Sequence, residues 1–135
     1  MKKLLSINYS AGAFSAAMLF LRLGIGFLMM WHGYDKLLHF SILHNQFLNF
    51  MGLGSTFSLT LVIFAEFFCS LFLVLGLFTR LSSIPLIITM CVALFKVHQG
   101  DFFGKGEIDA LYLISYMVLL FLGPGRVSVD SMIGK

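Results

Sequence analysis

The chain has 135 residues, of which 59% are hydrophobic and only 11% are charged, and its mean hydropathy is +0.98. Soluble domains carry about 25% charged residues, so this composition excludes an ordinary soluble domain and places most residues in lipid or in a bundle interior. The net charge of +3 comes from scattered basic residues that form no basic patch, so we expect no nucleic-acid partner.

Four apolar segments follow one another, at about residues 13–40, 57–78, 81–98 and 107–122. Backbone polar groups inside a membrane must be satisfied within their own segment, so each segment is expected to be a helix. Spanning takes roughly 20 residues, which makes the last two segments short for a crossing. Short connections favour antiparallel neighbours. The sequence therefore predicts an all-α, up-down, integral membrane four-helix bundle that forms one transmembrane domain over residues 1–135.

The N-terminal region and the first connection also carry signals. Lys2 and Lys3 precede the first apolar segment, but polar residues separate them from it and the segment exceeds signal-peptide length. This pattern favours a retained first membrane helix. Between the first two segments, apolar residues at helical spacing predict a short interfacial helix over about residues 42–51.

The distribution of Lys and Arg predicts the orientation in a bacterial inner (plasma) membrane. Short cytoplasmic loops carry an excess of these residues. Five of them fall on the side of the two termini: Lys2, Lys3, Arg80, Arg126 and Lys135. Three fall on the opposite side: Lys36, Lys96 and Lys105. This asymmetry predicts a multi-pass protein with both termini in the cytoplasm.

Arg22 and Glu66 are charged residues within apolar segments. Counted from the expected helix starts, each lies roughly 13 Å along its helix at 1.5 Å per residue, near the middle of the membrane. An unpaired charge at that depth is costly, so we expect the two side chains to form a central buried ion pair. Such a pair serves either to fix helix register or as a proton or anion site.

A second polar group is expected at the outer membrane surface. His32 and Lys36 are one turn apart on the first helix, while Lys96 and His98 close the third helix at the same level. Asp109 begins the fourth helix there, and Tyr116 lies deeper on it. These residues are either ordinary interfacial and capping groups or a pocket for a quinone headgroup or a small anion.

The sequence gives less support to a metal site or to thiol chemistry than to the polar sites above. His32 and His98 could in principle ligate a haem between two helices, but interfacial histidines are common without metal, so we expect no metal site. Cys69 and Cys91 form no CxxC pair and have no metal-ligand spacing, which favours two buried structural cysteines.

Several short motifs together resemble the DoxX family of small bacterial four-helix membrane proteins. In chain order they are Arg22-x-x-x-Gly26, Trp31-His32-Gly33 with Lys36, Glu66, Leu75-Gly76-Leu77-Phe78-Thr79-Arg80, Lys96-x-His98 and Gly123-Pro124-Gly125-Arg126-x-Ser128-x-Asp130. The likeness covers nearly the whole chain, and the order and spacing of the motifs carry it.

The resemblance implies an oxidoreductase, or a membrane subunit of a redox complex, linked to quinones or sulfur compounds. The sequence has no obvious dithiol, which argues against a self-contained thiol enzyme. The expected partners are membrane lipid together with a redox partner protein or a homo-oligomer. The alternative is a module that binds or transports a small metabolite or anion, with Arg22 and Glu66 as its central site.

Overall fold

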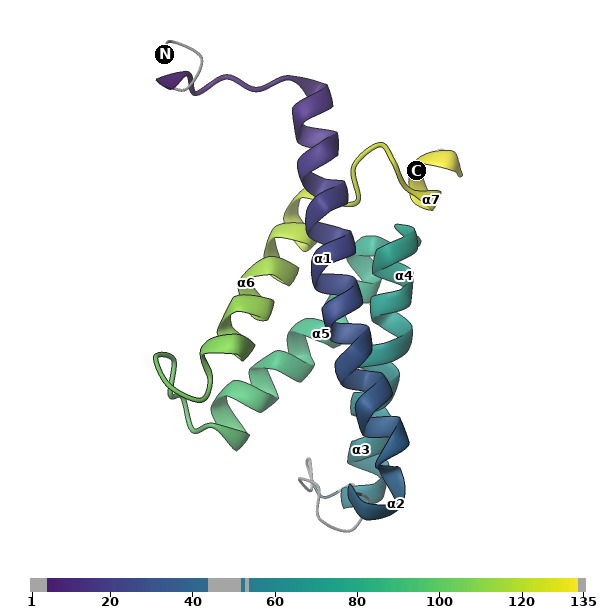
Figure 1. Ribbon diagram of the computed structural model, residues 1–135, viewed down its shortest axis with the longest axis vertical. Helices are drawn as coiled ribbons and strands as arrows, with labels where there is room; N and C mark the ends of the chain where they lie inside the picture. Colours follow the sequence, from purple (N-terminus) through teal and green to yellow (C-terminus); the bar gives the residue numbers. More distant parts are fainter. Residues whose placement is uncertain (1–4, 44–51, 53, 134–135) are drawn as a thin grey trace.

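The computed structural model describes residues 5–43, 52 and 54–133, and within these residues it contains helices and connections but no β-strand (Figure 1). The helices are α1 (Ala11–Leu38), α2 (Phe40–Leu43), α3 (Ser55–Ile63), η3 (Phe64–Cys69), α4 (Ser70–Leu75), α5 (Thr79–Val92), η4 (Ala93–Val97), α6 (Glu107–Leu122) and α7 (Val129–Met132). The segments α3, η3 and α4 form one continuous helix, as do α5 and η4.

Three of these helices are long and apolar enough to cross a membrane: Ala11–Leu38, Ser55–Leu75 and Thr79–Val97. The fourth, α6, has 16 residues. Large apolar side chains such as Phe20, Phe27, Ile114 and Phe121 are exposed on the outside of the helices. Apolar surface of this extent indicates contact with lipid. The chain is therefore an all-helical membrane protein.

Local capping sets the helix ends. The Ser10 hydroxyl accepts a hydrogen bond from the Ala13 amide at 3.0 Å, so α1 begins at Ala11 rather than near residue 13. The second long helix ends at Leu75, before the predicted residue 78, because Gly76 adopts a left-handed conformation with φ of 73°. The Gly76 and Leu77 amides then donate to the carbonyls of Leu73 and Phe72, which closes the helix in a Schellman motif. Of the predicted interfacial helix, α2 extends to Leu43, and residues 44–51 lie outside the described part.

The long helices pack as two pairs. Helix α1 lies along η3 and α4, and two glycines allow the close approach. A Cβ on Gly26 would lie 2.5 Å from Val74 Cγ2, and one on Gly33 would lie 2.7 Å from the Phe67 amide nitrogen. Helix α5 packs mainly against α6 and also contacts η3.

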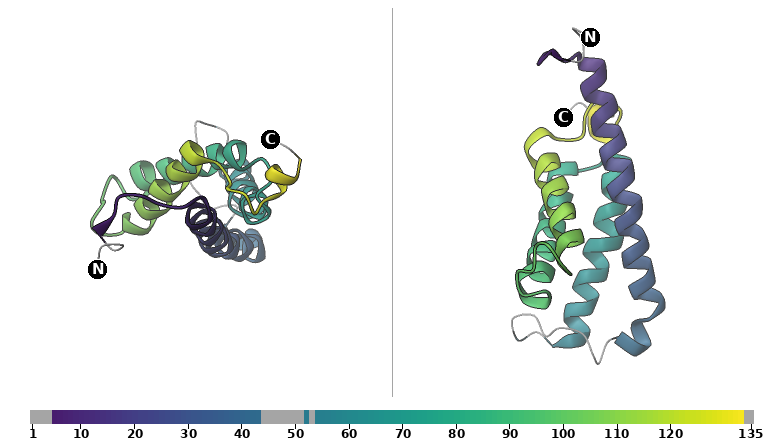
Figure 2. Two further views of the ribbon diagram at one scale, coloured as in Figure 1. Left: turned by 90° about the horizontal axis from the view of Figure 1, so that it is seen from above. Right: turned by 60° about the vertical axis from the view of Figure 1, so that its left-hand side comes forward.

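The two pairs diverge toward the end that lies away from the termini, as Figures 1 and 2 show. The hydrophobic core includes Met29, Leu73, Leu86, Tyr116 and Leu119. The start of α1 and the C-terminal α7 lie near the same end of the molecule (Figure 1). A cavity lies between the diverging pairs.

Candidate functional site

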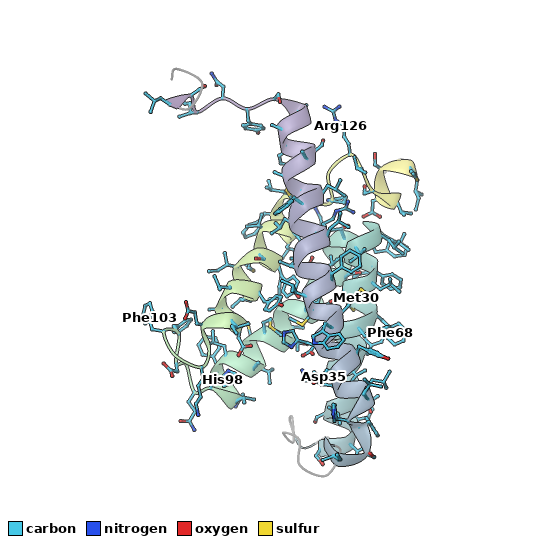
Figure 3. All side chains as sticks on the ribbon, in the orientation of Figure 1. Met30, Asp35, Phe68, His98, Phe103 and Arg126 are labelled. Atoms are coloured by element: carbon cyan, nitrogen blue, oxygen red, sulfur yellow. The ribbon has the colours of Figure 1, made fainter. Side chains whose placement is uncertain are left out.

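A cavity of about 550 Å³ lies between the two helix pairs, and residues of α1, α3, η3, α5, η4 and α6 line it. Its wall is mainly apolar. The titratable residues in the wall are His32, Lys36, Glu66, His98, Asp109 and Tyr112. A cavity of this size with few polar groups is typical of small-molecule sites. Figure 3 shows His98 at the end of the α5–η4 helix and Asp35, one residue before Lys36, at a similar height on α1.

One wall carries an ion pair between Lys36 of α1 and Glu66 of η3. Lys36 Nζ donates to Glu66 Oε1 at 2.7 Å. The Glu66 side chain is 5% exposed and that of Lys36 is 26% exposed, so the carboxylate is buried while the ammonium retains some access. Glu66 is thus a buried carboxylate in the cavity wall, and its ion-pair partner is Lys36.

The opposite wall carries a second pair, between His98 and Asp109. His98 Nδ1 lies 2.5 Å from Asp109 Oδ2. His98 directly follows η4, and Asp109 lies in the first turn of α6, so the loop at residues 99–106 brings the two side chains together. A carboxylate that accepts from Nδ1 fixes the orientation of the imidazole and leaves Nε2 as its free nitrogen.

Aromatic contacts join the two walls. The His32 ring meets the Tyr112 ring edge-on, with centroids 6.1 Å apart, and so connects α1 to α6. Tyr112 in turn stacks on Tyr116, with centroids 6.0 Å apart. Tyr116 is fully buried beneath the cavity rather than in its wall.

In each of the two walls, one polar residue lies in a π-helical turn or directly after one. Glu66 lies within η3, and His98 is the residue directly after η4. Each π turn adds a residue to its helix and so re-aims the side chains beside it. Such turns occur frequently at functional sites. Sequence reasoning gave no sign of them, because their residues have the same apolar composition as the α-helical turns around them.

A smaller recess of about 460 Å³ lies on the far side of His98, with Val97, Gln99, Asp101 and Lys105 in its wall. His98 thus lines both the cavity and the recess. Its side chain is 27% exposed, compared with 16% for Asp109.

The predicted Arg22–Glu66 ion pair is wrong, because each side chain has another partner. Glu66 pairs with Lys36, while Arg22 Nη2 donates to the carbonyl of Val127 in the C-terminal segment. The reason is helix register. Gly33 lies against Glu66 and Phe67, so Arg22, 11 residues earlier on α1, lies about 16 Å farther along. The prediction assumed that both helices begin at the membrane surface, whereas the first turns of α1 extend beyond the end of α4 (Figure 1).

Arg22 instead lies in a cluster with Gly76, Asp130 and the backbone carbonyl of Val127. Arg22, Gly76 and Asp130 are buried, whereas the Val127 side chain is exposed. The Asp130 carboxylate accepts from the amides of Phe78 at 2.8 Å and Thr79 at 3.0 Å. The Asp130 amide donates to the Gly76 carbonyl at 2.9 Å. Sequence reasoning cited Gly76 and Asp130 only as motif members. Their separation in sequence concealed that they meet.

The predicted pocket residues divide as follows. His32, Lys36, His98 and Asp109 line the cavity, whereas Lys96 is exposed and is not part of the wall. Tyr116 lies beneath the wall, and Tyr112 lines the cavity in its place.

Few of the described residues are arranged to bind a metal ion or to carry out thiol chemistry. Within the described ranges, no group of three or more His, Cys, Asp or Glu side chains is arranged to hold a metal ion. Cys69 is buried, Cys91 is half-buried and neither forms a disulfide.

Comparison with known proteins places the chain in a family. The family model described as DoxX matches residues 17–99, which include most of α1, the next two long helices and His98 but not Asp109. A protein of Haemophilus influenzae, described as uncharacterized, is 30% identical over 125 residues, covering 86% of this chain and 90% of its own. An uncharacterized membrane protein of Mycobacterium tuberculosis is 28% identical over 130 residues, covering 85% of this chain and 80% of its own. No solved structure gives a significant match. The chain therefore belongs to the DoxX family.

Proposed function

We propose that this protein binds a lipid-soluble molecule with a polar headgroup, of the quinone type, and serves as a membrane subunit of a redox complex. The observation that carries the proposal is the cavity between the helix pairs, whose mainly apolar lining carries one acid–base pair on each of two opposite walls. A partner protein supplies or accepts the electrons, because the two cysteines are unbonded and no dithiol is visible in the sequence.

The rim of the cavity favours a ligand that arrives from the membrane. Exposed apolar side chains from both helix pairs stand around it: Leu61, Phe64, Ile88, Val97 and Ile108. In a bilayer such a rim faces acyl chains, so an isoprenoid or alkyl tail can remain in lipid while the headgroup enters.

The polar groups suit a headgroup that accepts hydrogen bonds. Lys36, His32 and Tyr112 carry N–H or O–H groups, and quinone carbonyls are acceptors. Lys36 and His98 are each already paired with a carboxylate, which disfavours a small inorganic anion. The alternative of an anion transporter also loses its central site, since Arg22 and Glu66 have separate partners.

Direct binding of decylubiquinone to protein in lipid nanodiscs tests the proposal. Lys36→Gln is expected to weaken binding about tenfold, or ~1.4 kcal/mol. Lys96→Gln is the matched control, because Lys96 is an outer-end lysine that does not line the cavity. Equal affinities of the wild type and both variants, or no binding to the wild type, would contradict the proposal. Identification of lipids that co-purify with the protein, by mass spectrometry, would reveal a native ligand independently.

We also propose that α6 is a fourth span and that both termini lie in the cytoplasm of a bacterial inner membrane. Helix α6 is about 24 Å long at 1.5 Å per residue, close to the roughly 30 Å of a bilayer core. Arg80 Nη2 donates to the Phe121 carbonyl at 3.4 Å, so the end of α6 lies beside the start of α5. Four spans return the chain to the side where it began.

A further inference from the structure

His98 is positioned between the membrane cavity and the outer polar recess. Among the described residues, only Val97 and His98 line both spaces, and of these two His98 has the titratable side chain. The cavity is mainly apolar, whereas the recess carries Gln99, Asp101 and Lys105. A group with access to both spaces can exchange protons between a molecule in the cavity and water outside.

The imidazole is held in a way that suits this exchange. Asp109 lies 2.5 Å from Nδ1, so that nitrogen donates to the carboxylate and Nε2 is left with its lone pair. The partial exposure of the His98 side chain, 27%, leaves the ring accessible to water.

Other charged groups also act on this site. The titratable or charged residues that line the cavity or the recess on the surrounding elements are His32, Lys36, Glu66, Asp101, Lys105 and Tyr112. Lys36 and Glu66 neutralise each other across 2.7 Å. The His98–Asp109 pair is therefore the acid–base group of the cavity that also reaches the recess.

From this geometry we infer that His98, oriented by Asp109, exchanges a proton between a hydroxyl group of the bound molecule and water in the recess. The inference rests on the proposed function and narrows the ligand to lipid-soluble molecules with an ionisable hydroxyl, such as hydroquinones. In the forward step the O–H bond of the ligand breaks and its electron pair stays on oxygen. The proton bonds to Nε2 of His98 and is then released from Nε2 to water. No electron moves in this step.

A lipid-soluble alkyl nitrophenol is a suitable probe, because its phenolate absorbs visible light and so reports its own ionisation in the site. In nanodiscs, the pH midpoint of the bound probe is expected to rise by about one unit, a tenfold change, from the wild type to His98→Gln. Asp109→Asn should move it in the same direction. His39→Gln is the matched control: His39 is an outer-end histidine beside Asp35 that does not line the cavity, and this variant should match the wild type.

The methyl ether of the same probe separates the two proposals, because it lacks the ionisable hydroxyl. If the ether binds the wild type and His98→Gln equally while the phenol midpoint is the same in both, the proton-exchange role is wrong and the binding function stands. If neither probe binds the wild type, the proposed function fails, and this inference fails with it. If the ether no longer binds to His98→Gln, the Asp109→Asn variant is used for the test instead. An unchanged pH midpoint of the bound phenol in Asp109→Asn then overturns the proton-exchange role of His98.

Discussion

Helix register decides which partner each of the buried charges Glu66 and Arg22 meets. Glu66 is matched with Lys36, and removing one member of a buried pair costs about 3–5 kcal/mol because it leaves the other uncompensated. We expect Glu66→Gln and Lys36→Met each to destabilise the protein, and the double variant to be more stable than the sum of the two effects predicts. Thermal unfolding in detergent measures this.

Glu66→Gln combined with Arg22→Met should be additive within about 0.5 kcal/mol, since these residues share no partner. Strong coupling between Arg22 and Glu66 would instead restore the pairing expected from the sequence.

Gly76 is the position in the Arg22 cluster where a side chain is least tolerated. Its φ of 73° disfavours any L-residue with a Cβ, and that Cβ would overlap Arg22 Nη1 and the side chain of Ser128. Gly76→Ala is therefore expected to lower the free energy of unfolding by about 2 kcal/mol or more, through strain and displacement of Arg22.

Gly24→Ala is the matched control for this change. Gly24 is helical, and nothing lies within 4 Å of the position that a Cβ would occupy, so alanine there should be neutral or stabilising by up to about 1 kcal/mol. Similar unfolding midpoints for Gly76→Ala and Gly24→Ala would contradict the role assigned to the cluster.

At the scale of the elements, the C-terminal segment caps the start of α5. Phe78 has a positive φ of 49°, unusual for a residue with a side chain, and the Asp130 carboxylate holds both its amide and that of Thr79. Asp130→Ala is expected to cost about 2 kcal/mol, at the upper end for loss of a helix cap. Hydrogen exchange should accelerate at the first amides of α5. Asp101→Ala provides the control, because Asp101 accepts a longer, exposed bond of 3.3 Å from the Lys105 amide. Equal effects of the two changes would exclude the capping role.

The sequence predicted the helical segments from apolar length and a group of polar residues near helix ends, because both predictions depend on local composition. Register was not accessible to it: Glu66 pairs with Lys36 because Gly33 brings α1 against η3, a contact between distant positions. The same holds for Asp130, whose role depends on a chain reversal after Gly123. The divergence of the two helix pairs depends on their packing, and no residue pattern indicated it.

At the scale of the whole molecule, the two helix pairs are joined at one end and open at the other (Figures 1 and 2). The Arg22 cluster ties α1, the turn at Gly76, the start of α5 and the C-terminal segment together at the joined end. The cavity occupies the open end, with its polar pairs on opposite walls. The contacts of the Arg22 cluster and the cavity thus lie at opposite ends of the helix pairs.

The orientation of the molecule in the membrane is the last prediction. Three exposed sites report it in a chain whose native cysteines are replaced by alanine: Asn8→Cys near the N-terminus, Phe103→Cys in the loop after η4 and Ser131→Cys in α7. Phe103 is 97% exposed and projects from the end opposite Arg126 (Figure 3). An even number of spans places Asn8 and Ser131 on one side, and the excess of Lys and Arg near the termini places that side in the cytoplasm. A membrane-impermeant maleimide should therefore label Phe103→Cys in intact spheroplasts and the other two variants only after lysis. Labelling of Asn8→Cys and Ser131→Cys from opposite sides would mean that α6 does not cross the membrane. In that case the His98–Asp109 pair would lie at a membrane surface rather than at the mouth of a four-helix cavity.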